Sequence, residues 1–209
     1  KAIDDYTKAI QLDPDYSDVY FNRGLAYGQL EQYEKAIEDY TKAIELNQNY
    51  AEVYNYRGDV YWELKQYKKA IEDYTKAIEL NPDYGDAYYS RGDAYLELEQ
   101  YDKVIEDFTK AIELNPKHEA LDDIYFQRGY AYYELGQYDK TIEDYTKAIE
   151  RNSYVSSENY LRRGLVYADS RQYDKALEDY NKAIEIDPSD QDAINKRRIL
   201  LEEHPELKP

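Results

Sequence analysis

The chain has no cysteine, no methionine and only two histidines among its 209 residues. Without cysteine, neither a disulfide framework nor a thiolate metal site can form. His118 and His204 lie far apart in the sequence, so we expect no histidine metal site and no cofactor. No apolar run approaches the ~18 residues that a membrane-spanning helix requires. The first residues also lack the basic-then-apolar pattern of a signal peptide.

The charge is strongly one-sided, with 45 acidic against 27 basic residues, a net charge of −18 and an isoelectric point near 4.5. A polyanion gains no affinity from releasing the counterions of phosphate. We therefore expect neither nucleic acid nor an anionic membrane as a partner. We expect a cytoplasmic location. The chain opens without methionine and in the middle of a repeat, so we interpret it as a fragment or processed product.

What the chain does have is an internal repeat of 34 residues. The segment AIEDYTKAIEL stands at 36–46 and again, unchanged, at 70–80, and close variants begin at residues 2, 104, 141 and 176. A unit of this length cannot bury its own apolar face and must stack on its neighbours. Function is then expected on the extended surface of the stack.

The copies divide the chain into five full repeats with partial ends. Repeats 1 to 5 span 17–50, 51–84, 85–121, 122–156 and 157–190. A second helix of a truncated repeat (1–16) precedes them, and a capping helix (191–204) and a tail (205–209) follow. Repeat 3 carries three extra residues, 119–121, and repeat 4 carries one, Ser156. We expect these extensions to lengthen a second helix or the turn after it.

Each repeat has the pattern of two helices. In the first half, apolar residues recur at positions 3, 4, 10, 11 and 14, which is a helical spacing. Asn-Pro or Asp-Pro ends the second half in most copies, because proline cannot continue a helix. Position 8 is always glycine: Gly24, Gly58, Gly92, Gly129 and Gly164. Since a glycine inside a helix costs about 1 kcal/mol, we predict close approach of the second helix there, with Ala36, Ala70 and Ala176 as the facing residues.

The order Tyr-x-x-x-Gly-x-x-Tyr, followed by Ala, Tyr, Ala and Pro at positions 20, 24, 27 and 32, resembles the tetratricopeptide repeat (TPR) family over essentially the whole chain. The resemblance implies an all-α fold. Its helix-turn-helix repeats would stack into a right-handed α-solenoid, with the first helices lining a concave surface.

Position 7 of each repeat is arginine and position 23 is aspartate, and the partial ends add one of each. The set is Asp5, Arg23, Asp39, Arg57, Asp73, Arg91, Asp107, Arg128, Asp144, Arg163, Asp179 and Arg197. The six aspartates and six arginines can all be paired one-to-one only if each aspartate pairs with the arginine of the next repeat, from Asp5–Arg23 to Asp179–Arg197. We favour such inter-repeat pairs over the alternative, an anion site, because a ligand site seldom needs the same charge in every repeat.

Positions 2, 5, 9, 12 and 13 of the first helix remain after the core positions are removed, and we call this set the first-helix stripe. Positions 5, 9 and 12 vary from copy to copy. The candidate binding residues are Phe21, Leu25, Asn55, Asp59, Trp62, Glu63, Tyr89, Asp93, Phe126, Tyr130, Tyr133 and Glu134. Exposed aromatics are typical interface anchors, and carboxylates favour a basic partner. In the alternative interpretation, the acids keep the array in solution and the aromatics pack between helices.

The leading hypothesis is a protein–protein interaction scaffold that binds an extended or helical segment, basic with apolar anchors. The alternative is a self-associating or consensus-like, engineered array without an evolved ligand. An uncovered apolar strip on residues 1–16 favours self-association. We predict no enzyme activity, since no phosphate-binding glycine loop and no nucleophile–histidine motif is present.

Overall fold

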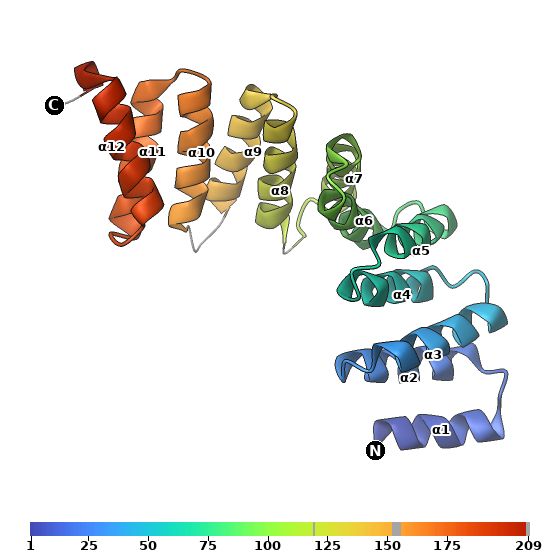
Figure 1. The fold of residues 1–209 in the computed structure, drawn as a ribbon. Helices are drawn as coiled ribbons and strands as arrows, with labels where there is room; N and C mark the ends of the chain where they lie inside the picture. Colours follow the sequence, from blue (N-terminus) through green and yellow to red (C-terminus); the bar gives the residue numbers. More distant parts are fainter. Residues whose placement is uncertain (119, 152–155, 208–209) are drawn as a thin grey trace. The chain divides into compact units, whose positions relative to one another are not determined.

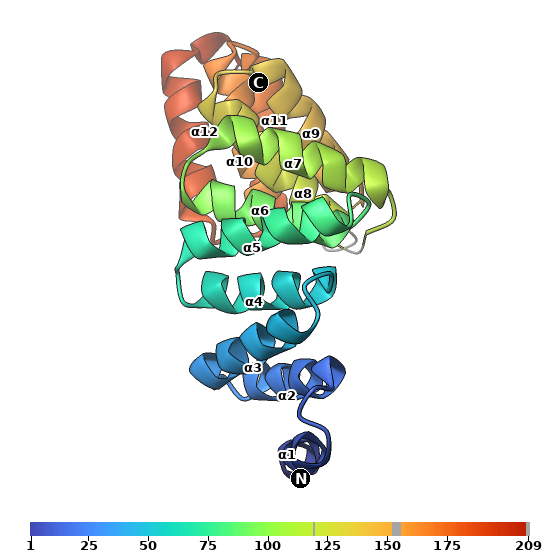
Figure 2. The same ribbon diagram turned by 90° about the vertical axis from the view of Figure 1, so that its right-hand side faces the viewer.

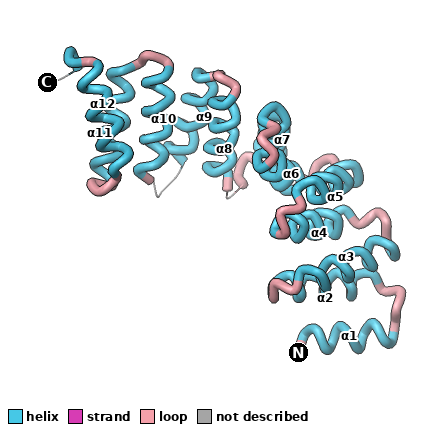
Figure 3. The backbone as a smooth tube through the Cα atoms, viewed as in Figure 1, coloured by secondary structure: helices cyan, strands magenta, loops and turns pink. Residues whose placement is uncertain are grey.

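A computed structural model describes residues 1–118, 120–151 and 156–207. These residues form twelve α-helices and one short 3-10 helix, with no strand among them (Figure 1, Figure 3). No helix in this part of the chain is long and apolar enough to cross a membrane. The chain divides into two compact units, Lys1–Asn115 and Pro116–Pro209, and each is described by itself.

The first unit contains α1 to α7. The helices are α1 (Ala2–Leu12), α2 (Ser17–Gln29), α3 (Tyr33–Leu46), α4 (Ala51–Glu63), α5 (Tyr67–Leu80), α6 (Gly85–Glu97) and α7 (Tyr101–Leu114). The pairs α2–α3, α4–α5 and α6–α7 are hairpins, and in addition α3 packs on α4 and α5 packs on α6 (Figure 2). First helices of successive hairpins touch as well, α2 with α4 and α4 with α6.

The second unit repeats this arrangement. Its helices are α8 (Leu121–Glu134), α9 (Tyr138–Arg151), α10 (Ser157–Asp169), α11 (Tyr173–Ile186) and α12 (Gln191–Glu203), and η1 (Pro205–Leu207) follows. The hairpins are α8–α9 and α10–α11, and α12 packs on α11. Ala193 and Leu200 of α12 are buried and Arg198 is exposed, as expected for a terminal helix with one polar face. Sequential helix-on-helix packing makes the protein an all-α solenoid.

The turn inside each hairpin depends on one residue in the left-handed region. Its φ lies between 55° and 70° in every hairpin, at Glu31, Lys65, Glu99, Gly136 and Arg171. This conformation lets the chain reverse while the following amide still bonds the first helix, as Gln32 N–H does to the Tyr27 carbonyl at 2.9 Å. Only one of these five positions is glycine.

The second helices α1 (Ala2–Leu12), α5, α7 and α11 (Tyr173–Ile186) end where Asn-Pro or Asp-Pro predicted an end. In α5, the amide of Asn81 closes the helix on the Ala77 carbonyl at 2.9 Å. The Asn81 side chain then accepts the amide of Asp83 at 3.2 Å, which starts the turn to the next hairpin. Asp13, Asn47 and Asp187 make the same side-chain turn.

The repeated glycines face aromatic rings, so the prediction of facing alanines is wrong. A Cβ added to Gly24 would lie 2.6 Å from the Tyr40 ring, and the Tyr or Phe at position 24 lies equally near the glycine in the other four hairpins. Ala36, Ala70 and Ala176 are fully buried, but they are not the nearest neighbours of the glycines. Glycine is required because the ring of the second helix occupies the space of its side chain.

The predicted Asp–Arg pairing between repeats is also wrong, because the ion pairs lie within each hairpin. Arg91 donates from Nε to Oδ2 and from Nη2 to Oδ1 of Asp107, both at 2.8 Å. The same two-bond pair joins Arg23–Asp39, Arg57–Asp73, Arg128–Asp144 and Arg163–Asp179. Asp5 is exposed, and Arg197 donates instead to Asn181 at 3.2 Å.

The link between repeats uses the remaining nitrogen of the arginine. Nη1 of Arg91 donates at 3.1 Å to the hydroxyl of Thr75, which belongs to the preceding hairpin. Arg23, Arg57 and Arg163 reach Thr7, Thr41 and Thr146 in the same way. Each of these arginines therefore fixes its own hairpin through aspartate and the preceding second helix through threonine.

The extension of repeat 3 does not lengthen its second helix. α7 has 14 residues, as α3 and α5 do, and α8 begins at Leu121, which is 2% exposed. Residue 119 lies outside the described residues, and so do residues 152–155, which precede Ser156.

Candidate functional site

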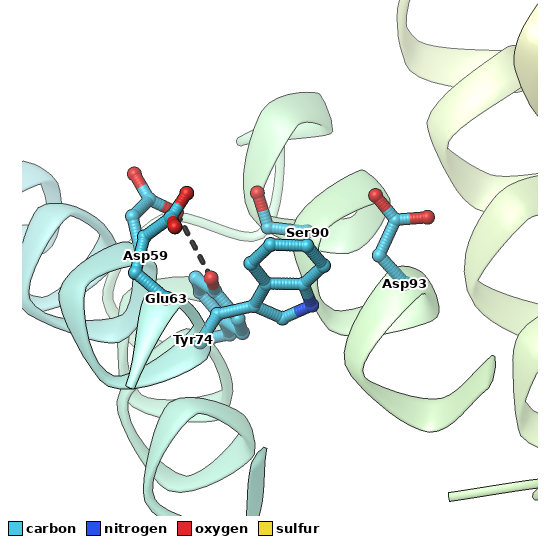
Figure 4. Close-up of a pocket in the computed structure, with 6 residues that line it drawn as sticks. Asp59, Glu63, Tyr74, Ser90 and Asp93 are labelled. Carbon is cyan, nitrogen blue, oxygen red and sulfur yellow. Dashed lines mark hydrogen bonds between the residues drawn. The ribbon is translucent and has the colours of Figure 1, made fainter. Parts of the chain in front are cut away.

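A cavity of about 190 Å³ opens between the first helices α4 and α6 of the first unit. Its lining residues are Asp59, Trp62, Glu63, Tyr74, Ser90 and Asp93. Figure 4 shows Asp59 and Glu63 on one side and Asp93 on the other, with Ser90 between them. Asp59 and Glu63 come from α4, Ser90 and Asp93 from α6, and Tyr74 from α5, which packs on both.

Asp59 lies in an environment that disfavours its charged form. Its Oδ1 accepts the Tyr74 hydroxyl at 2.9 Å, and Asn55 Nδ2 donates to its Oδ2 at 3.4 Å. Burial, reinforced by the charges of Asp86 and Glu63, raises the pKa of Asp59 to about 6 against the opposing hydrogen bond from Tyr74. Burial and the neighbouring Asp59 charge also raise the pKa of Tyr74. The carboxylate is thus held where its negative charge is poorly compensated.

Two buried polar atoms near Asp59 have no hydrogen-bond partner among the described residues: Nε1 of Trp62, a donor, and Oδ1 of Asn55, an acceptor. Asn55 is 5% exposed. The Trp62 ring contacts Tyr67 edge-on, at 6.2 Å between centroids. Such unpaired buried atoms are uncommon in folded proteins and need an explanation.

The structure brings together four of the predicted stripe residues, namely Asp59, Trp62, Glu63 and Asp93. Sequence reasoning missed Ser90, which stands at position 6, and Tyr74, which stands at position 24. Position 6 holds Asn22, Tyr56, Ser90, Gln127 and Arg162 in the five repeats. It therefore carries no repeating signal that could have marked Ser90.

Phe21 and Asn55 are buried, which corrects their prediction as surface contacts. Phe21 is 8% exposed and its ring lies 5.3 Å from Tyr50 and 5.5 Å from Tyr56. Phe21 is therefore a core residue of α2. Leu25 is half-buried and packs against the same core cluster.

Tyr89 and Phe126 are half-buried and stack on the aromatic rings that cover the repeated glycines. The centroid of Tyr89 lies 6.0 Å from that of Phe108, and the centroid of Phe126 lies 5.0 Å from that of Tyr145. These two rings combine packing with partial exposure, so the packing interpretation holds for part of the stripe.

In the second unit, Tyr133 connects two first helices. Its hydroxyl on α8 donates to Oδ2 of Asp169 on α10 at 2.8 Å. This hydrogen bond, with burial, raises the pKa of Tyr133 to about 12. Tyr130 is half-buried and Glu134 is exposed on the same helix.

A larger opening of about 550 Å³ lies between α10 and α12. Leu161 and Leu165 line it at stripe positions 5 and 9, and charged side chains of both signs surround them, including Arg162, Lys196 and Asp192. This opening combines an apolar wall with polar groups, a common composition of binding sites.

Comparison with protein-family models gives matches along the chain. A model described as "Tetratricopeptide repeat" matches residues 17–50, 85–118, 122–154 and 158–190, which is more than half of the sequence. A "TPR repeat" model matches 1–31 and 58–98, and a further "Tetratricopeptide repeat" model matches 39–72. The chain belongs to the tetratricopeptide repeat family.

Solved structures agree with this assignment. YrrB, described as a TPR protein with an unusual peptide-binding site, is 28% identical, with a TM-score of 0.83 over 92% of this chain and 97% of YrrB. MamA is 30% identical, with a TM-score of 0.66 over 71% of this chain and 85% of MamA. MamA from Desulfovibrio magneticus RS-1, at 20% identity and a TM-score of 0.75 over 84% of this chain and 97% of that one, shows the fold alone. No curated protein sequence matches the chain.

Membership of the TPR family makes the chain a protein-interaction scaffold, and TPR proteins are generally non-enzymatic. The repeated arginines direct two nitrogens each to an aspartate of the same hairpin. They therefore belong to the TPR scaffold and do not form an anion site. Among the described residues, no group of three or more acidic or histidine side chains is arranged to hold a metal ion.

Proposed function

We propose that this TPR chain binds a basic segment of another protein, extended or helical and with apolar anchors, along its first helices. The observation that carries the proposal is the α4–α6 cavity, which is lined by three carboxylates and an indole. None of its six lining residues is basic. A cationic side chain of a partner would supply the missing positive charge.

Charge supports the same partner at longer range. With a net charge of −18, the chain attracts a basic segment and accelerates its capture, an effect that weakens with salt. The same charge opposes binding of nucleic acids and anionic lipid surfaces.

Apolar anchors have candidate positions in both units. Trp62 lines the cavity between α4 and α6, and Leu161 and Leu165 line the opening between α10 and α12. In YrrB, the description of a peptide-binding site concerns a TPR protein 28% identical to this chain, which supports a peptide ligand here.

The test is a peptide array of matched sequences that contain the same apolar residues with lysine or arginine, with glutamate, or with serine. We expect binding of the basic series alone, with an affinity that falls as salt rises, and no binding of a single-stranded RNA oligonucleotide. Trp62→Ala should weaken binding of the basic series, and Glu38→Gln, on the exposed side of α3, should not. Equal capture of the acidic and basic series would refute the proposal.

A second proposal is self-association through α1, and a specific observation favours it. Ala2 is exposed, whereas Ala36 and Ala70 at the same repeat position are fully buried, and Leu12 is 88% exposed. A second copy that covers this face would remove apolar surface from water. Sedimentation velocity should show a concentration-dependent dimer that Ala2→Glu abolishes. A monomer at all concentrations would refute self-association.

A further inference from the structure

We propose, as a refinement that rests on the proposed function, that the α4–α6 cavity binds the guanidinium group of an arginine side chain from the partner. The guanidinium would lie among Asp59, Glu63 and Asp93 with the indole of Trp62 beside it.

The cavity has the right capacity. Its volume of about 190 Å³ corresponds to about six water molecules at ~30 Å³ each. An arginine side chain beyond Cβ has six non-hydrogen atoms. The volume of the cavity is therefore sufficient for the end of an arginine side chain.

The charges around the cavity all have one sign. α4 contributes Asp59 and Glu63, α6 contributes Asp86 and Asp93, and α5 contributes the neutral hydroxyl of Tyr74. Buried acids elsewhere in this chain are paired with arginine, as Asp107 is with Arg91. A guanidinium in the cavity would give Asp59 the partner that the chain provides to those other acids.

The unpaired Nε1 of Trp62, a residue that lines the cavity, provides independent support. Trp62 Nε1–H requires an acceptor, which a peptide carbonyl next to the inserted arginine would supply. A peptide that inserts an arginine thus brings a positive charge for the acids and a backbone acceptor for the indole.

Arginine fits better than lysine for a geometric reason. Acceptors lie on α4 and on α6, and a planar guanidinium presents five donors that can reach both helices, whereas an ammonium presents three. Guanidinium also stacks on aromatic faces, and Trp62 is the only tryptophan in the chain.

No other repeat can form the same site. At position 9, where Asp59 and Asp93 stand, the other repeats have Leu25, Tyr130 and Leu165. At position 12, the indole of Trp62 is replaced by Gly28, Leu96, Tyr133 and Ala168. The inference therefore predicts one arginine pocket for each chain.

The experiment uses a small-molecule probe first and a peptide probe second. N-acetyl-arginine amide and its uncharged citrulline analogue are titrated while the fluorescence of Trp62 is recorded. We expect a saturable change with arginine, a weaker one with lysine and none with citrulline. Asp59→Asn should abolish the arginine response, and Glu38→Gln, on the exposed side of α3, should leave it unchanged.

The second probe is a basic peptide found with the array, in which each arginine in turn is replaced by citrulline. Replacement of the arginine that enters the pocket should weaken binding about tenfold in the wild type but about twofold or less in Asp59→Asn. A double-mutant cycle reports this difference as coupling between the arginine and Asp59. Affinity for the arginine peptide should fall up to about tenfold from pH 7 to pH 5, because Asp59 becomes protonated while guanidinium stays charged. Circular dichroism verifies the fold of each variant, and Asp93→Asn provides a second test of the pocket.

The outcomes separate the two proposals. If basic peptides bind but every citrulline replacement acts equally on the wild type and on Asp59→Asn, the arginine pocket is refuted and the proposed function stands. If the small arginine probe binds and no basic peptide does, the proposed function is refuted and the pocket stands. If neither binds, both are refuted.

Discussion

The substitution Asp59→Asn tests the electrostatics of the α4–α6 cavity without any ligand. It replaces a carboxylate by a neutral group of the same shape, which can still accept the Tyr74 hydroxyl. Because burial and two nearby acids raise the pKa of Asp59 from 3.8 to about 6, its ionised form destabilises the folded state. The variant should therefore be more stable than the wild type at neutral pH.

The sign and size follow from proton linkage. Between the unfolded pKa of 3.8 and the folded pKa of about 6, the folded state holds more protons, so raising the pH lowers the stability of the wild type. With these values, the stability of the wild type should fall by on the order of 1 kcal/mol relative to that of the variant between pH 5 and pH 8. The full penalty of ionised Asp59 is on the order of 3 kcal/mol.

The assay is urea denaturation of both proteins at pH 5, 6, 7 and 8, followed by circular dichroism. Lower pH is avoided because the isoelectric point is near 4.5. The absolute difference at one pH also contains the hydrogen bonds of the new amide, so the change of the difference with pH is the decisive quantity. Glu38→Gln, which removes an exposed carboxylate of α3 outside the cavity, serves as the control for the loss of one negative charge. A difference between wild type and Asp59→Asn that stays constant from pH 5 to pH 8 would refute the reasoning.

Three further predictions concern the scaffold. Gly24→Ala should destabilise the protein by about 1–3 kcal/mol, because the added Cβ would lie 2.6 Å from a buried ring. Gly28→Ala in the same helix meets only an ordinary contact at 3.8 Å and should stabilise the protein by up to about 1 kcal/mol. Thermal melts compare the two variants. Arg91→Ala should cost about 3–5 kcal/mol by leaving a buried aspartate unpaired, while Thr75→Val should cost about 1 kcal/mol, and neither should change peptide binding. Lys65→Gly should stabilise by about 1 kcal/mol in urea denaturation, since the lysine has φ 56°; a destabilised variant would show that other lysine contacts matter more.

The helices and their ends could be predicted because the repeat states each signal several times. The spacing of apolar residues predicted the two helices of each repeat. Asn81 and the proline after it predicted a helix end, which the structure confirms. The hairpin turns could not be predicted in this way. Their left-handed residues are Glu31, Lys65, Glu99 and Arg171, and only Gly136 has the residue type that signals this conformation.

The Asp–Arg pairing was mispredicted because it was inferred from the equal numbers of aspartates and arginines. The positions of these residues on the two helices of a hairpin were not used. The glycine at position 8 meets the ring at position 24 of the same hairpin, as Gly92 meets Phe108. Positions 7 and 23 are the residues directly before these two, so they meet in the same hairpin as well, as Arg91 meets Asp107. Had the glycine been assigned to the ring, the pairing would have followed. The single bond to threonine, which joins neighbouring repeats, has no comparable signal in the sequence.

The contrast between two kinds of buried aspartate is the strongest indication of where binding occurs. Five aspartates at position 23 are buried beside an arginine that bonds both carboxylate oxygens, so their charge is compensated within the chain. Asp59 instead accepts hydrogen bonds from the neutral groups of Tyr74 and Asn55, and its charged neighbours are acids. A scaffold role would not require this arrangement, because leucine or tyrosine occupies the same position in three other repeats. Binding sites commonly give up stability at variable, accessible positions, which supports the proposal that the partner of Asp59 is a cation supplied by a ligand.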